Sequence, residues 1–410
     1  MGSPRTKHRL ARAGLTLLLA LAWLAGVPSA ARAQTAVQFN DVAAFVSFGE
    51  HILFQARIET TTPLQALYLL LEPQGAAPVY LPVELNERGE LQYQLDPGRY
   101  SIRPFAQVTY AFRAEFESGQ PVTSEHYRVD YIDTRYTWQD LSEGSLSVYW
   151  YDRDIAFGQS ALNNAVAGMK SVQTLLPARF SDPIRIFIYG SSSDLQGVMK
   201  GTPSWVAGHA APDLGVVLIS IPAGPDEGLE MQRQIPHELM HLAQYEVIGE
   251  NFTNQPYWLI EGMASEAELY PNPEYGRALE KAVETRKLLP LADLCAGFPR
   301  DASGAFLSYA QSASFMGYLY EQYGASGMRD LTLKYKDGLS CDKGVSSAFG
   351  LTLSQLEYRW QQESLGVNPE GLVARKLFPY LAVAGVMFGM MIVSIVLASR
   401  RPKPAEQKSR

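Results

Sequence analysis

Alternating apolar and polar residues mark the first part of the chain. Residues 52–58 and 108–116 alternate in this way, which predicts strands with one buried face. Residues 66–71 form a continuous apolar run, which is typical of a strand covered on both faces. Turn-forming residues separate these runs, for instance at residues 96–98. Residues 34–133 are therefore predicted to form an antiparallel β-sandwich of the immunoglobulin or fibronectin kind.

The rest of the chain contains both strand-like runs and segments with helical spacing. Apolar runs at residues 184–189 and 214–221 predict further strands. Residues 155–176 and 307–324 carry apolar residues at helical spacing, and the second of these helices is expected to end at its terminal glycine. Residues 134–365 are therefore predicted to form a second domain that mixes helices and strands.

The N-terminal residues 1–33 are predicted to be a secretory signal peptide. Four basic residues precede an uncharged apolar stretch at residues 13–27, and residues 31–33 read Ala-Arg-Ala, which is a cleavage pattern. The alternative is an uncleaved signal anchor, for which the apolar stretch is short.

A second apolar stretch lies near the other end of the chain. Residues 377–399 contain no charged residue and are long enough to cross a bilayer as one transmembrane helix. Basic residues in the segment 400–410 mark the cytoplasmic side, and residues 366–376 are expected to be a tether. These features predict a single-pass protein of the cell membrane whose folded domains lie outside the cytoplasm. A buried core helix is the alternative.

The distribution of charge argues against a nucleic-acid partner. The chain has a formal charge of −7; residues 1–33 carry +5 and residues 400–410 carry +4, so residues 34–399 carry −16. An acidic body of this kind does not favour nucleic acid or an anionic lipid surface.

Two cysteines lie in the second predicted domain. Cys295 and Cys341 have neither the spacing of a redox pair nor that of zinc ligands. In an oxidising compartment they can form a disulfide bond. Two free buried thiols are the alternative.

A five-residue motif carries the candidate chemistry. His237, Glu238 and His241 form the pattern His-Glu-x-x-His. On a helix, residues four apart lie on the same face, so the two imidazoles can bind one metal ion while Glu238 flanks it. A carboxylate in that place can take a proton from a metal-bound water. Because Pro236 precedes His237, this helix is expected to begin or to kink at the proline.

A third metal ligand is available further along the chain. Glu261 follows His241 after 19 residues, within the segment Trp-Leu-Ile-Glu-Gly-Met-Ala at residues 258–264. Together the two motifs resemble those of the gluzincin metallopeptidases, the thermolysin-like and aminopeptidase-like clan of peptidase MA-like proteins. The resemblance implies that His237, His241 and Glu261 bind one zinc ion. It also implies that Glu238 is the general base for hydrolysis of a peptide bond by a zinc-activated water.

The same resemblance implies how substrate is held. In gluzincins, a strand at the position of residues 214–221 forms the edge of the cleft and pairs with the substrate backbone, which is a form of strand addition. His209 lies just ahead of this strand and is interpreted as a surface or loop histidine, with an approach to the metal site as the alternative.

Supporting residues can be assigned only in part. Gluzincins often carry an acidic residue one turn after the ligand glutamate, where it orients a zinc-bound histidine. Ser265 occupies that position here, with Glu266 and Glu268 nearby as substitutes or as part of a solvated acidic face. Tyr309 lies in a later predicted helix and is a candidate donor to the oxyanion, with core packing as the alternative.

The sequence thus predicts an α+β protein. It has an N-terminal antiparallel β-sandwich, a gluzincin-like α+β metallopeptidase domain and a single C-terminal transmembrane helix. The predicted function is that of a membrane-anchored, extracytoplasmic zinc metallopeptidase acting on a peptide or protein substrate. The alternative is a surface binding or adhesion module that keeps the zinc fold without turnover.

Overall fold

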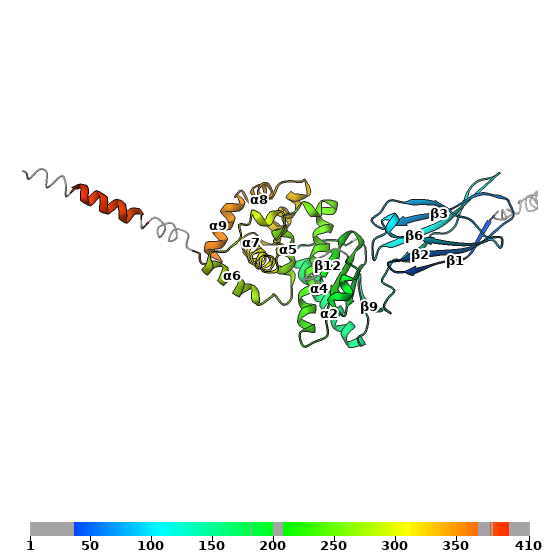
Figure 1. Cartoon of the computed structure of the whole chain (residues 1–410), viewed down its shortest axis with the longest axis horizontal. Coiled ribbons are helices and arrows are strands. Elements are labelled where there is room, and N and C mark those ends of the chain that lie inside the picture. Colours follow the sequence, from blue (N-terminus) through cyan, green and yellow to red (C-terminus); the bar gives the residue numbers. More distant parts are fainter. Residues whose placement is uncertain (1–36, 181, 200–207, 368–377, 379, 393–410) are drawn as a thin grey trace, which may run out of the picture. The chain divides into compact units, whose positions relative to one another are not determined.

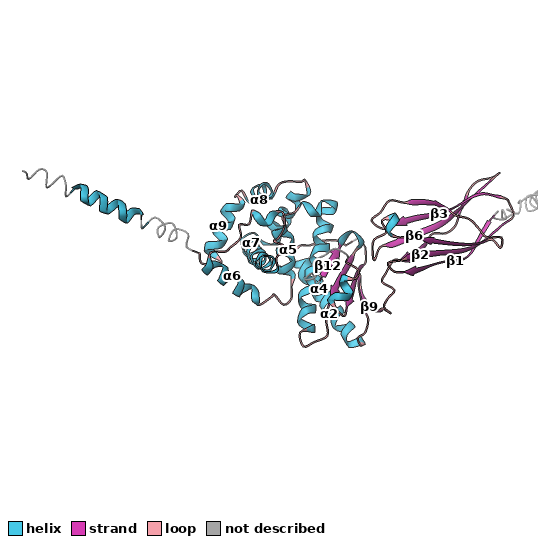
Figure 2. Cartoon of the chain, viewed as in Figure 1, coloured by secondary structure: helices cyan, strands magenta, loops and turns pink. Residues whose placement is uncertain are grey.

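The computed structural model describes residues 37–180, 182–199, 208–367, 378 and 380–392 (Figure 1). The chain divides into two compact units, Met1–Ile132 and Asp133–Arg410. Strands make up most of the first unit, and helices dominate the second (Figure 2). The predicted signal peptide lies outside the described residues.

The first unit contains two antiparallel sheets. One has the strand order β1-β2-β5, and the other has the order β4-β3-β6-β7, with β8 also paired to β6. The alternation predicted for residues 52–58 is present in β2, where every second side chain is buried. The strands are β1 (Val37–Ser47), β2 (His51–Thr60), β3 (Leu64–Pro73), β4 (Val79–Pro82), β5 (Glu90–Leu95), β6 (Gln107–Phe116), β7 (Val122–Thr123) and β8 (Tyr127–Asp130).

Strand β3 differs from its prediction. Leu67, Leu69 and Leu71 are buried, whereas Tyr68 and Leu70 between them are only half-buried. The expectation that residues 66–71 are covered on both faces is therefore wrong. The apolar run reflects one core face and one face that is partly open to solvent, a distinction that a continuous apolar run does not encode.

The second unit is built on a five-stranded mixed sheet with the order β12-β13-β11-β10-β9. The three central strands are parallel, and β9 and β12 run antiparallel to their neighbours. The strands are β9 (Gln139–Glu143), β10 (Leu146–Trp150), β11 (Ile184–Tyr189), β12 (Gly208–Ala211) and β13 (Val216–Ser220).

The edge strand next to the candidate motif is β12. The prediction that residues 214–221 form the edge of the cleft is therefore wrong. Strand β13 pairs with β11 on one side and with β12 on the other, which leaves it no edge for substrate. The short strand β12 consists of Gly, His and two Ala residues, which lack the β-branched and aromatic pattern of a strand. His209 lies on this strand and its side chain is exposed.

Helices pack on one face of the sheet and extend beyond it. Val148, Ile186 and Val217 point from the sheet into a core that also contains Ala161 and Leu239 of two long helices. The helices are α2 (Ile155–Leu175), α3 (Ser192–Gln196), α4 (Glu227–Ile248), α5 (Tyr257–Ala267), α6 (Glu274–Thr285), α7 (Ala302–Lys336), α8 (Cys341–Phe349) and α9 (Leu353–Glu363). Short 3₁₀ turns are η1 (Gly98–Tyr100), η2 (Pro212–Leu214), η3 (Gly249–Asn254) and η4 (Asp293–Cys295).

Helix α4 begins well before Pro236, at which it was expected to begin or to kink. Its first residue is Glu227, so Pro236 lies in the helix interior. A proline in that place costs about 3 kcal/mol in an isolated helix. Here the ring is buried against α2, where Gly168 has no side chain; a Cβ atom on Gly168 would lie 2.8 Å from Pro236 Cγ. Tertiary packing therefore accommodates a residue that local propensity places at a helix end.

The predicted helix end at Gly324 is present inside the longer helix α7. Gly324 has φ 63° and interrupts the helical backbone, after which the chain resumes helical structure to Lys336. The left-handed conformation suits glycine, which has no Cβ atom to oppose it.

Part of the apolar stretch near the C-terminus is described. Residues 380–392 are helical. Within the described residues, no helix has both the length and the apolar character needed to cross a membrane. Of the predicted span 377–399, residues 377, 379 and 393–399 lie outside the described residues.

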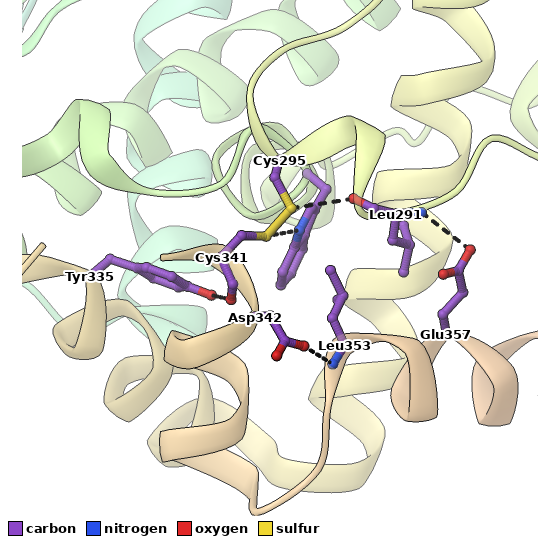
Figure 3. The surroundings of a disulfide bond; sticks show 8 residues. Leu291, Cys295, Tyr335, Cys341, Asp342, Leu353 and Glu357 are labelled. Carbon is purple, nitrogen blue, oxygen red and sulfur yellow. Dashed lines mark hydrogen bonds between the residues drawn. A yellow bond between two sulfur atoms is a disulfide. The ribbon is translucent and has the colours of Figure 1, made fainter. Parts of the chain in front are cut away.

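A disulfide bond joins Cys295 of η4 to Cys341 at the start of α8, with a Cα–Cα distance of 6.0 Å (Figure 3). Trp258 of α5 donates its indole N–H to the Cys341 sulfur at 3.3 Å. The hydroxyl of Tyr335 donates to the Cys341 carbonyl oxygen at 2.8 Å (Figure 3). The pairing left open by the sequence is thus resolved, and the bond lies against the helix that carries Glu261.

Removal of this disulfide is expected to destabilise the second unit. The bond closes a loop with a sequence separation of 46 residues, for which the chain-entropy relation gives roughly 4 kcal/mol. The double variant Cys295→Ser, Cys341→Ser should therefore unfold at lower urea concentration, followed by tryptophan fluorescence. Wild-type protein kept under reductant is the control and should behave like the double variant. An unchanged midpoint would contradict the prediction.

Candidate metal centre

Helix α4 places two histidines on one face. His237 and His241 are four residues apart, and their ring centroids lie 5.1 Å from each other. Both side chains are largely buried, with 14% and 11% of their surface exposed. Leu239, Met240 and Leu242 anchor the same part of the helix in the core.

Helix α5 brings the third group to the two histidines. Glu261 Oε2 lies 3.3 Å from His237 Nε2 and 3.9 Å from His241 Nε2. The three ligand atoms all lie within 4.8 Å of one another. Donor atoms around tetrahedral zinc are about 3.4 Å apart, and two imidazoles with one carboxylate are a donor set of catalytic zinc sites. The residues therefore fit a zinc ion in both spacing and chemistry.

Two further side chains orient the histidines. Glu268 Oε1 lies 3.1 Å from His237 Nδ1, and Gln244 Oε1 lies 3.2 Å from His241 Nδ1. Gln244 is held in turn because its amide donates to the Ile260 carbonyl oxygen at 3.2 Å. Acceptors at both Nδ1 atoms favour an N–H at those atoms, so that each Nε2 can offer its lone pair to a metal ion that replaces any proton there.

The sequence analysis identified only one of the two side chains that orient the histidines. Glu268 was one of two nearby substitutes for the acidic residue missing at Ser265, and it is Glu268 that contacts His237. It lies just beyond the last residue of α5, where helical spacing no longer relates it to Glu261. Gln244 was missed, although its position three residues after His241 was a usable signal.

Electrostatics couple the three candidate ligand residues. Burial disfavours the charged form of His237, but hydrogen bonds with Glu261 and Glu268 outweigh it and raise the pKa of His237 well above its usual value. The pKa of Glu261 is lowered, because the effect of burial is exceeded by its contacts with His237 and His241. Burial lowers the pKa of His241. Glu261 is thus an anion beside nitrogen donors, as a metal ligand must be.

Glu238 lies beside the cluster and is not one of its three members. Its side chain is buried, and burial raises its pKa to about 7. The carboxylate lies beneath the edge strand β12, where a Cβ atom on Gly208 would collide with Oε1. A carboxyl group with a pKa near neutrality is suited both to take and to return a proton.

Tyr309 of α7 reaches the same site. Its hydroxyl donates to Glu261 and helps to lower the pKa of that carboxyl. Its ring lies 6.4 Å from the ring of His237 and 5.0 Å from that of Phe298, measured between centroids. The core-packing alternative is therefore incomplete, because the polar end of Tyr309 faces the cluster.

A cleft of about 390 Å³ opens over these residues. Gly208, His209 and Ala210 of β12 line one part of it. Another part is apolar and comprises Phe252 of η3 together with Tyr257 and Ile260 of α5. Among the described residues, the cluster thus opens to a cleft that is bounded by the last strand of the sheet and by aromatic side chains.

Comparison with known proteins supports the class of protein that this site defines. Residues 164–365 match the family model described as the Peptidase MA superfamily. The match includes the His-Glu-x-x-His motif, Glu261 and the residues that orient the histidines. The resemblance of the second unit to gluzincin-type metallopeptidases is therefore confirmed. A search of curated proteins gives no match.

The solved structures that match the chain include the following two. The aminopeptidase N family protein from Idiomarina loihiensis is 11% identical with a TM-score of 0.38, and the alignment covers 79% of this chain and 75% of that chain. The M1 zinc metallopeptidase from Deinococcus radiodurans is 11% identical with a TM-score of 0.33, covering 80% and 94%. These scores are too low to transfer activity, so the assignment to a peptidase class depends on the family match and on the site.

Glu268→Ala is expected to weaken zinc binding. Loss of a side chain that orients a metal-binding histidine typically lowers metal affinity about 10- to 100-fold. Competition with a zinc-chelating dye would measure the dissociation constant. Glu266→Ala is the matched control, because Glu266 is a partly buried carboxyl of the same helix end with no contact to His237 among its described interactions. Equal affinity in both variants would show that Glu268 does not orient His237.

Proposed function

We propose that the second unit is a zinc-dependent peptidase that hydrolyses peptide bonds. His237, His241 and Glu261 hold one zinc ion, and Glu238 is the general base. The observation that carries the proposal is the convergence of two Nε2 atoms and one carboxylate oxygen beside a buried carboxyl group with a pKa of about 7.

The roles of the side chains follow from their positions. A bound zinc ion supplies a Lewis acid that polarises a carbonyl group and makes water a better nucleophile. Glu238 accepts the proton of the attacking water and delivers it to the leaving amine. Tyr309, whose hydroxyl donates to Glu261 in this structure, turns its proton instead to the oxygen that becomes negatively charged in the transition state. Glu268 and Gln244 keep the two imidazoles in their binding orientation.

The cleft suits an extended peptide. A substrate backbone can add to the edge strand β12 through main-chain hydrogen bonds. Strand addition of this kind recognises any extended chain, so the side chains around the cleft supply the selectivity. Phe252 and Tyr257 favour an apolar side chain next to the bond that is cleaved.

We also propose that the protein is membrane-anchored with both folded units outside the cytoplasm. The support is the signal-like segment 1–33, the uncharged stretch 377–399 and the basic segment 400–410. Fusion of a cytoplasmic reporter after residue 410 and of an export-dependent reporter at residue 370 tests this topology. Activity of both reporters is expected, and inactivity of both would contradict it.

The peptidase proposal is tested by profiling the full-length chain against a peptide library. Zinc content near one ion per chain with defined cleavage sites is expected, and the Glu238→Gln variant should yield no cleavage. One zinc ion per chain without any cleavage would instead favour a binding module that keeps the metal fold.

A further inference from the structure

The proline beside the first metal-binding histidine leaves one helix carbonyl without its usual partner. In an α-helix, each N–H bonds to the carbonyl oxygen four residues earlier. Pro236 has no N–H, so the carbonyl group of Gln232 has no partner within α4 at that position. The proline ring also crowds this carbonyl group, which tilts it away from the helix axis.

The partner of this carbonyl comes from the end of α5. The backbone N–H of Leu269 donates to the Gln232 carbonyl oxygen at 2.9 Å. Leu269 directly follows Glu268, whose Oε1 lies 3.1 Å from His237 Nδ1. Two neighbouring residues after α5 therefore contact α4 on either side of the proline, one through its backbone and one through its side chain.

Glu268 depends on this attachment for its position. It lies beyond the last residue of α5 and has extended backbone angles of φ −57° and ψ 131°. The regular helix therefore does not dictate where its side chain points. The side chain is only 3% exposed, so a displacement would bury a carboxylate away from its imidazole partner.

We infer that Pro236 is a positioning residue of the metal centre. It frees the Gln232 carbonyl to hold Leu269, and this bond fixes Glu268 against His237. The small residue Gly168 makes room for the proline ring on α2. The inference rests on the proposed function, since it concerns how the His237 ligand is oriented for zinc.

Pro236→Ala gives the first test. Alanine restores an N–H at position 236, which competes with Leu269 for the Gln232 carbonyl. The zinc dissociation constant of the full-length chain is expected to rise about tenfold, the lower end of the effect of losing an orienting residue. Pro225→Ala is the matched control, because Pro225 is an exposed proline in the loop before α4. Its zinc dissociation constant should equal that of wild type.

A double-mutant cycle separates positioning from general damage to the helix. If Pro236 acts through Glu268, Pro236→Ala should change zinc affinity by less than about twofold once Glu268→Ala is present. A purely structural role would lower the affinity by the same factor in both backgrounds, and this result would overturn the inference.

Leu269→Pro removes the same hydrogen bond from its donor side. The ψ angle of Glu268 is 131°, which is the conformation that a residue before proline prefers, so the substitution suits the preceding backbone. Its zinc dissociation constant should rise as in Pro236→Ala. Wild-type affinity in both variants would overturn the inference and leave the peptidase proposal intact. Wild-type protein that binds no zinc at this site would overturn both.

Discussion

Glu238→Gln is expected to abolish peptide hydrolysis while the protein keeps its zinc. The glutamine has nearly the shape of the glutamate, but it cannot accept a proton from water. Loss of a general base typically lowers the rate 10²- to 10⁴-fold, which corresponds to roughly 3–5 kcal/mol of activation free energy. Zinc content should stay at the wild-type level, because Glu238 is outside the cluster of ligand atoms.

The measurement combines metal analysis with the rate of hydrolysis of one library-derived peptide. Glu230→Gln is the matched control on α4, since Glu230 contacts Arg233 and Gln234 and lies away from the histidines. This control should retain both zinc and activity. Hydrolysis that persists in Glu238→Gln would place the base elsewhere.

Glu261→Ala should instead lose zinc and activity together. The substitution removes one of three ligand atoms and leaves two imidazoles, so zinc affinity is expected to fall by at least about 100-fold, beyond the usual effect of an orienting residue. Added zinc should restore part of the activity of Glu261→Ala and none of that of Glu238→Gln. This difference separates a ligand from a base without any structural measurement.

The outcome for Glu261 also tests the assignment of the site. Zinc titration of the purified variant gives its dissociation constant directly. Should Glu261→Ala bind zinc as tightly as wild type, the third ligand lies elsewhere. The gluzincin-type arrangement of the site would then be wrong.

The ligand cluster was predictable because its spacing is local. His237 and His241 depend only on the helical repeat, and Glu261 depends on one characteristic segment. The edge strand was not predictable by the same means. β12 contains Gly208, where a larger residue would collide with Glu238. No hydrophobic pattern in the sequence encodes that contact.

The continuation of helix α4 through Pro236 could not be predicted from the sequence pattern either. From the sequence alone, Pro236 indicates that the helix begins or kinks at that residue. The structure retains the helix on both sides of it because Gly168 receives the ring and Leu269 supplies a donor to the Gln232 carbonyl. Both partners are far from Pro236 in sequence, so only tertiary structure shows them. The position of Glu268 could not be predicted for the same reason.

The proposed metal-binding atoms belong to one stretch of chain, whereas the disulfide joins more distant segments. All three ligands and both orienting side chains lie between residues 237 and 268, and Cys295 and Cys341 are 46 residues apart. Helix formation takes about 0.1–1 μs and loop closure is faster still, whereas disulfide formation takes seconds to hours. The α4–α5 hairpin is therefore expected to gain protection from hydrogen exchange before the disulfide forms, so that newly made chains bind zinc ahead of oxidation.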